Sequence, residues 1–133
     1  MIQTIPDGFE PHFKSSSMTD PWEPLFSQTL ADRVQIGFNS SSAHTNSRGF
    51  VHGGLISSIA DNAMGLSCAT QYLEPKNLLT VHLAVDFVSI AKVGQWLLFD
   101  TSYSKVGRSV CYAQCFVYAD DTIVARANAV FKA

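Results

Sequence analysis

The feature that most constrains this chain is the order of its regular segments, because one long helical pattern precedes four consecutive strand patterns. Apolar residues recur at helical spacing across residues 54–73, and Glu74-Pro75 supplies a stop signal. Short connections between successive strands indicate an antiparallel meander. A sheet that buries one face on a single long helix is a two-layer α+β fold. The four strand-like runs are 78–90, 95–105, 109–119 and 122–131.

The part of the chain before the helix is less regular. Residues 1–27 contain four of the five prolines and little periodicity, so we predict an irregular lead-in. We expect a short helix near 24–28 and expect the lead-in to wrap a neighbour or cover a sheet end. Val34, Ile36 and Phe38 alternate with polar residues and predict one further strand. The 133 residues have room for a single domain, 1–133.

Two side-chain patterns bear on what the helix and the next strand contact. The helix face opposite its apolar stripe is small or polar, so it is either a solvated face or a surface that another backbone approaches. It reads Ser57, Ser58, Asp61, Asn62 and Gly65. In the run 78–90, alternation predicts two faces. The apolar face holds Val81, Leu83, Val85 and Phe87, and the other face holds Thr80, His82, Ala84 and Asp86.

Composition and charge exclude several classes of function. The net charge of -2 gives no basic field for a phosphate backbone, so we expect no nucleic-acid partner. No apolar run approaches the roughly 18 residues of a membrane span, and Met1 to Asp20 lacks a secretion signal. We therefore expect a cytoplasmic protein without membrane association. Cys111 and Cys115 lie about 13 Å apart on a strand, too far for a disulfide, so buried free thiols are predicted.

The segment that carries chemistry is the loop before the helix. The sequence contains no Gly-rich phosphate loop, no His-Glu-x-x-His helix and no Gly-x-Ser-x-Gly elbow, and its four histidines lack ligand spacing. We therefore expect neither a metal nor another cofactor. The run His-Thr-Asn-Ser-Arg-Gly-Phe-Val-His-Gly-Gly at 44–54 leads into the helix that carries Asp61. Its glycine pair either forms a tight turn or leaves N–H groups that stabilise an oxyanion, worth roughly 3–4 kcal/mol.

The spacing of Asn46, His52-Gly53-Gly54 and Asp61 resembles the signature of the PaaI-like branch of hotdog-fold acyl-CoA thioesterases. Weaker similarity continues through 80–83, 89–94 and 105–109, so the resemblance covers about the last two thirds of the chain. It implies an α+β hotdog fold, in which a meander sheet wraps around one long central helix. It also implies hydrolysis of an acyl-CoA thioester to CoA and a carboxylic acid, without a cofactor.

The resemblance further implies roles for individual residues. Asp61 would act as nucleophile or as general base toward water, and the Gly53 N–H would polarise the thioester carbonyl. Asn46 and His52 would orient water or substrate, and Thr80 would hydrogen-bond near the carboxylate. The predicted substrate-binding set is Gly54, Lys105, Arg108 and Ser109. Its two basic residues flank the Gly107 turn, where they either meet CoA phosphates or form a solvated hairpin tip.

Two positions depart from the family pattern. Ile90 stands where many relatives have proline, and His82 stands where a polar or acidic residue is more usual, so the shape of the acyl pocket stays open. Aromatic residues leave the same question unanswered, because Phe50, Phe87 and Trp96 suit either a roomy pocket or core packing. The sequence does not determine whether the acyl group is aromatic or aliphatic.

Helix geometry adds a prediction about assembly. Gly53 and Asp61 are eight residues apart on one helix, about 12 Å along its axis, so one thioester carbonyl cannot touch both. If both act on one substrate, they come from different subunits of a symmetric dimer with two interfacial sites. Relatives are built as homodimers or dimers of dimers. Two other functions remain open, namely non-catalytic acyl-CoA binding and a hydratase or dehydratase activity on the same fold.

Overall fold

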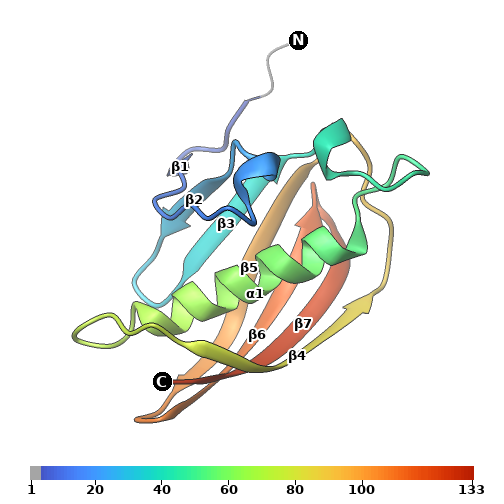
Figure 1. Cartoon of the computed structure of the whole chain (residues 1–133). Coiled ribbons are helices and arrows are strands. Elements are labelled where there is room, and N and C mark those ends of the chain that lie inside the picture. The colour runs from blue at the N-terminus through green and yellow to red at the C-terminus, as the bar shows by residue number, and fades with distance from the viewer. Residues whose placement is uncertain (1–3) are drawn as a thin grey trace.

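The computed structural model describes residues 4–133 and shows an antiparallel sheet that curls around one long helix (Figure 1). The helix α1 spans Gly53–Ala69, and two short 3-10 helices, η1 and η2, span Asp20–Trp22 and Ser42–His44. The predicted α+β class is confirmed. The strands are β1 (Glu10–Pro11), β2 (Phe26–Thr29), β3 (Val34–Asn39), β4 (Leu79–Phe87), β5 (Trp96–Val106), β6 (Val110–Ala119) and β7 (Thr122–Lys132).

The strand order corrects one detail of the predicted meander. The sheet runs β1-β2-β3-β5-β6-β7-β4, so β5, β6 and β7 form a meander but β4 pairs with β7 at the far edge. The connection from β4 to β5 is residues 88–95, which is longer than a hairpin turn and carries the chain across the sheet. As a result β4 is an edge strand of the sheet, with β7 as its one neighbour among the described strands.

The N-terminal region is more regular than predicted. The expected helix at 24–28 is wrong, because residues from Phe26 onward form β2, and Glu10 and Pro11 pair with β2 as β1. Periodicity failed here because the buried position of β2 is Ser27, at 6% exposure, which places a polar residue where the pattern requires an apolar one. The strand predicted at Val34, Ile36 and Phe38 is confirmed as β3, and all three side chains are buried.

The helix α1 packs its predicted apolar stripe on the concave face of the sheet. Leu55, Ile59, Ala63 and Met64 are buried, with neighbours from β3, β5, β6 and β7. The helix ends at Ala69, four residues before the predicted end, because the chain turns there and the Tyr72 hydroxyl donates to the Gly107 carbonyl at 2.7 Å. None of the helices within residues 4–133 has both the length and the apolar character that crossing a membrane requires.

A bulge in β4 corrects the predicted faces of that strand. Thr80 pairs with Phe131 and His82 pairs with Val130, so Val81 is an extra residue. Thr80 therefore faces α1 and shares that side with Leu83, Val85 and Phe87, which lie opposite the buried residues Ala129, Ala127 and Ala125. His82, Ala84 and Asp86 form the other face, as predicted. The alternation alone could not show this, because the bulge changes the phase of the pattern.

The three cysteines are free thiols and all are buried, as predicted. Burial raises the pKa of Cys68 to about 12 and, by the same cause, the pKa of Cys115 to about 12. Cys111 is fully covered and lies 3.1 Å from the Tyr72 hydroxyl. Cys111 and Cys115 both lie on strand β6 and form no disulfide with each other.

These thiols should not react with Ellman's reagent at pH 8 in the folded protein. The thiolate is the reacting form, and a pKa raised above the working pH keeps the thiols of Cys68 and Cys115 protonated, while burial blocks access. All three cysteines should titrate after denaturation in guanidinium chloride. Rapid labelling of a full equivalent before denaturation would contradict this burial.

Candidate active site

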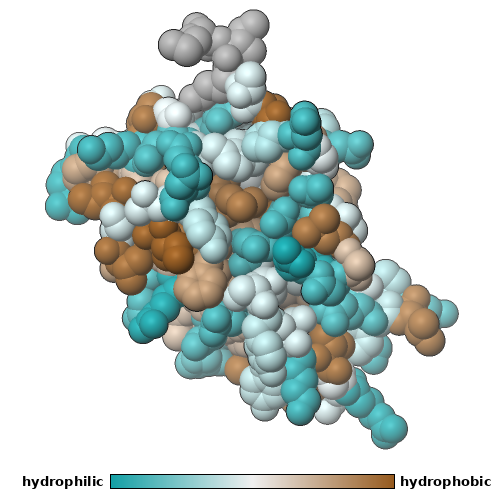
Figure 2. All heavy atoms as spheres, turned by 180° about the vertical axis from the view of Figure 1, so that it is seen from behind, coloured by the Kyte–Doolittle hydropathy of each residue, from teal (hydrophilic) through white to brown (hydrophobic). Residues whose placement is uncertain are grey.

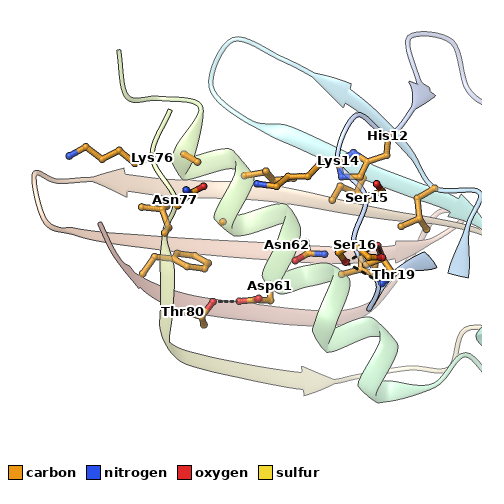
Figure 3. Close-up of a pocket in the computed structure, with 18 residues that line it drawn as sticks. His12, Lys14, Ser15, Ser16, Thr19, Asp61, Asn62, Lys76, Asn77 and Thr80 are labelled. Atoms are coloured by element: carbon orange, nitrogen blue, oxygen red, sulfur yellow. Dashed lines mark hydrogen bonds between the residues drawn. The ribbon is translucent and has the colours of Figure 1, made fainter. Parts of the chain in front are cut away.

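Asp61 lies in the middle of α1, on the side of the helix that faces β4, and borders a pocket of about 220 Å³ (Figure 3). One wall of the pocket is the N-terminal segment 12–19, and the opposite wall is the segment 76–80 that leads into β4. Its floor is largely apolar and is supplied by Leu25, Ile36, Ile59, Leu66, Leu78 and Phe131. A carboxylate at the edge of an apolar pocket can act on a bound carbonyl compound.

The carboxylate of Asp61 is positioned by β4. The Thr80 hydroxyl donates a hydrogen bond of 2.8 Å to Asp61 Oδ1 (Figure 3), as the resemblance implied. This contact depends on the bulge at Val81, which turns Thr80 toward the helix. Gly65, one helical turn beyond Asp61, lies against the ring of Phe131, where an added Cβ would meet Phe131 Cε1 at 3.4 Å. The helix therefore lies close to β7 beside the carboxylate.

The start of α1 has one engaged N–H group and one open N–H group. His52 is the N-cap, and its Nδ1 accepts a hydrogen bond of 2.8 Å from the Gly54 N–H. The Gly53 N–H forms no hydrogen bond with any group in residues 4–133. An added Cβ at Gly53 would meet Phe87 Cζ at 3.2 Å, so glycine lets the Phe87 ring pack closely on the start of the helix. The open donor of the predicted pair is thus Gly53, and His52 has a capping role.

Asn46 organises the loop before the helix. Its Oδ1 accepts hydrogen bonds from the N–H groups of Arg48 and Phe50 at 2.9 and 3.2 Å, which is an Asx-type turn. The side-chain Nδ2 of Asn46 has no acceptor among residues 4–133, so its two hydrogens are open. The loop side of the predicted site therefore offers two kinds of donor, from Asn46 and from Gly53.

The structure separates the predicted residues into two groups. Asp61 and Thr80 lie together at the pocket, whereas Asn46, His52 and Gly53 lie at the helix start. A second hollow of about 430 Å³ lies near that end, and its lining includes His52, Gly54 and Ser58. Asp61 does not line this hollow. Asn46 and Gly53 line neither cavity, so within one chain these loop donors are separate from the pocket that holds the carboxylate.

The predicted CoA-contacting residues lie elsewhere again. Lys105 is the penultimate residue of β5, and Arg108 and Ser109 form the turn to β6, all exposed beyond the C-terminal end of α1 (Figure 1). None of them lines the pocket at Asp61. The basic residues that do line it are His12, Lys14 and Lys76. Sequence reasoning missed these, because the segments that hold them have no periodic pattern.

The aromatic residues considered for the acyl pocket do not line it. Trp96 packs against Phe9 and Phe26, with ring centroids 5.3 and 6.4 Å apart, and lies over Gly37. Phe50 lies beneath the Arg48 guanidinium at 5.8 Å, and Phe87 lies against Gly53. His82 and Ile90, the two departures from the family pattern, are both exposed. Trp96 is half-buried and packs on N-terminal residues, away from the pocket.

The histidines and acidic residues give no further candidate centre. His44 is buried and its Nε2 lies 2.9 Å from the Trp22 carbonyl oxygen, which ties the loop to η1. Asp100 pairs with Arg33 at 2.8 Å, and Asp86 pairs with Arg126 at 2.9 Å on the outer face. Within residues 4–133, no three His, Cys, Asp or Glu side chains cluster in a way that could hold a metal ion.

Comparison with known proteins points to a single family. The model of the family described as Thioesterase superfamily matches residues 48–125. An inferred esterase of Pseudomonas aeruginosa, PA0474, is 34% identical over 131 residues, which are 98% of this chain and 98% of that protein. The family match includes Gly53, Asp61 and Thr80 and begins two residues after Asn46.

Solved structures agree with the fold described above. A point mutant of the phenylacetic acid degradation protein PaaI from Thermus thermophilus has a TM-score of 0.73 and 17% identity, covering 81% of this chain and 91% of that chain. A hypothetical thioesterase from Streptococcus pneumoniae, solved with coenzyme A, has a TM-score of 0.72 and 17% identity, covering 84% of this chain and 89% of that chain. These likenesses confirm the predicted PaaI-like hotdog fold.

Proposed function

Because this chain belongs to the thioesterase superfamily, we propose that it hydrolyses acyl-CoA thioesters to free CoA and a carboxylic acid. The observation that carries the proposal is the Asp61 carboxylate, held by Thr80 at the edge of a largely apolar pocket. An apolar pocket suits an acyl group, and a carboxylate beside it suits attack on the acyl carbonyl. A relative of the same fold was solved with coenzyme A, which supports CoA as the thiol portion.

Two chemical routes are open to Asp61. As general base, it takes a proton from water while the water oxygen attacks the thioester carbon, and the C–S bond then breaks to release CoA. As nucleophile, its oxygen forms an anhydride with the acyl group and expels CoA, and water then hydrolyses the anhydride. In both routes negative charge develops on the carbonyl oxygen, where the open Gly53 N–H would stabilise it.

Gly53 and Asp61 are supplied by two subunits in this proposal. They are the first and ninth residues of α1, about 12 Å apart along the helix axis, so one carbonyl oxygen and its attacking group cannot use both within one chain. In a symmetric dimer, Asn46, His52 and Gly53 of one subunit face Asp61 and Thr80 of the other. Two small residues near Asp61, Ser57 and Ser58, would allow a second backbone to come close.

The surface of β4 supports such a dimer. Its outer edge has no partner strand among residues 4–133, and an unpaired strand edge can pair with another chain. Apolar side chains there are uncovered, with 53% of Phe87, 58% of Val88 and 53% of Ile90 exposed. Figure 2 shows apolar patches on the side of the molecule where β4 and the following segment lie. A second copy that pairs through β4 would cover them. Lys105, Arg108 and Ser109 are then left exposed for CoA phosphates.

The test is thiol release from a panel of acyl-CoA substrates, measured with a disulfide dye in buffer that contains EDTA. At least one thioester should be hydrolysed with kcat/KM on the order of 10⁴ M⁻¹s⁻¹ or more, because typical enzymes reach this range. The rate should not depend on added zinc or magnesium. Uniform inactivity, including toward phenylacetyl-CoA and medium-chain thioesters, would favour non-catalytic acyl-CoA binding instead.

A further inference from the structure

Two lysines line the pocket at Asp61, one on each wall. Lys14 belongs to the N-terminal segment, and Lys76 belongs to the segment that leads into β4. Neither ammonium group forms an ion pair with a carboxylate among residues 4–133. Lys76 lies over the Tyr72 ring, 4.7 Å from its centroid. The pocket therefore carries two positive charges that no ion pair in the described part of the chain neutralises.

Each lysine is followed by a neutral hydrogen-bonding residue that also lines the pocket. Ser15 follows Lys14, and Asn77 follows Lys76. The Ser15 hydroxyl and the Asn77 amide form no hydrogen bond within residues 4–133, so both keep an open donor. A carboxylate accepts through two oxygens with about four lone-pair sites. The two walls together therefore offer the cations and the donors that a carboxylate needs.

The pocket is long enough to separate its cationic side from Asp61. Its lining on α1 runs from Asp61 to Ala69, eight residues apart and thus about 12 Å along the helix axis. Thr80 holds Asp61 in one part of the pocket, and the Lys76 side chain extends away from Asp61 (Figure 3). The floor is largely apolar. An alkyl chain whose carbonyl lies at Asp61 would therefore bring its far end toward the lysines.

The phosphates of CoA are another source of negative charge, but the pocket suits them less well. Its largely apolar floor suits an alkyl chain better than the pantetheine arm, which carries amide groups. The phosphates lie at the opposite end of that arm from the sulfur. With the carbonyl at Asp61 and the acyl chain on the floor, they would lie outside this pocket of about 220 Å³. A carboxylate on the acyl chain itself is the anion that fits.

We propose that the pocket selects acyl groups that end in a carboxylate, with Lys14 as the main recognising residue and Lys76 as a second positive charge. The assignment rests on the proposed function, which places the thioester carbonyl at Asp61. The substrate class is then dicarboxylic acids that are joined to CoA through one end. Because Lys14 is exposed, the expected preference is moderate, up to about fivefold for one solvated ion pair.

The experiment compares CoA thioesters of matched length, namely hexanoyl with adipoyl, octanoyl with suberoyl and decanoyl with sebacoyl. The wild-type protein should prefer the carboxylate member of at least one pair by about fivefold in kcat/KM. Salt of about 1 M should reduce this preference, because the Debye length falls to about 3 Å. Lys14→Met should remove most of the preference and Lys76→Met a smaller part. Lys14→Arg, which keeps the charge, should retain it.

Lys132→Met is the matched control, because it makes the same change at an exposed residue of β7 that does not line the pocket. This variant should keep the wild-type preference. Thermal unfolding checks that each variant is folded. Calorimetry with unreactive CoA thioethers of the same chains measures recognition without hydrolysis. Tighter binding of the carboxylate thioether that Lys14→Met removes, without hydrolysis of any thioester, would overturn the proposed function and support recognition by Lys14.

Three results would overturn the inference. Equal kcat/KM within all three pairs, or a preference that is unchanged in Lys14→Met, would do so while thioester hydrolysis stands. Pantetheine thioesters, which lack the CoA phosphates, test the other anion, and the wild-type preference should persist with them. If Lys14→Met slows both members of each CoA pair equally but leaves the pantetheine thioesters unaffected, Lys14 binds CoA phosphates instead. The absence of both hydrolysis and selective thioether binding would remove the inference together with the proposed function.

Discussion

Replacing Asp61 with Asn should lower kcat by about 100-fold or more, because the amide can neither take a proton from water nor attack the thioester carbon. Asn keeps an oxygen that accepts the Thr80 hydrogen bond, so the helix and β4 should keep their positions. Asp61 is half-buried, and its side-chain hydrogen bond is the one from Thr80. The measurement is steady-state kinetics on the best acyl-CoA of the panel, together with the thermal unfolding midpoint.

Asp121→Asn serves as the control for this change. It removes the same charge from an exposed residue in the turn between β6 and β7, and kcat should stay within about twofold of the wild-type value. If Asp61→Asn were also within a few-fold of wild type while both proteins unfold at similar temperatures, Asp61 would be a surface charge and the proposed mechanism would fail.

Mixing two inactive variants should restore about a quarter of the wild-type activity. Asn46→Asp keeps the oxygen that accepts from Arg48 and Phe50 but removes the open Nδ2 donors, and Asp61→Asn damages the other half of the site. Random pairing after unfolding and refolding in equal amounts gives about half mixed dimers. In each mixed dimer both lesions fall in one site, and the second site is built from undamaged residues.

The mixture needs two companion measurements. Each variant refolded alone should remain nearly inactive, and native mass spectrometry of isotope-labelled chains should confirm that mixed dimers have formed. Mixed dimers that show no recovered activity would mean that Asn46 and Asp61 serve the same site from the same chain. Monomers with full wild-type activity would also rule out a site shared between subunits.

The helix and the long strands could be predicted because their burial follows a simple period. Leu55, Ile59 and Ala63 lie at helical spacing and are all buried, and β5 to β7 follow alternating patterns. Strand β2 was missed because Ser27 occupies its buried position. The crossing of the chain from β4 to β5 was also missed, because local pattern defines strands and gives no information about which strands are neighbours.

The candidate site was predictable where it lies close in sequence. Asn46, Gly53 and Asp61 lie within one short stretch, and their spacing carries the family resemblance. The capping of Gly54 by His52 depends on a side-chain conformation that spacing does not determine. The wall made by His12 depends on the path of the N-terminal segment over α1, which is set by its pairing with distant strands and by contacts such as His12 with Leu25.

The bulge in β4 places two residues, Thr80 and Val81, opposite the single residue Phe131, so the strand contains a spare residue at the site. Loss of Val81 would leave Thr80 opposite Phe131 and beside Asp61. Loss of Thr80 would put Val81 there instead, with no hydroxyl to donate to the carboxylate. In both cases the pairing from His82 to Phe87 stays the same. A single-codon deletion in the gene can thus retain or remove the partner of Asp61 while the sheet keeps its register.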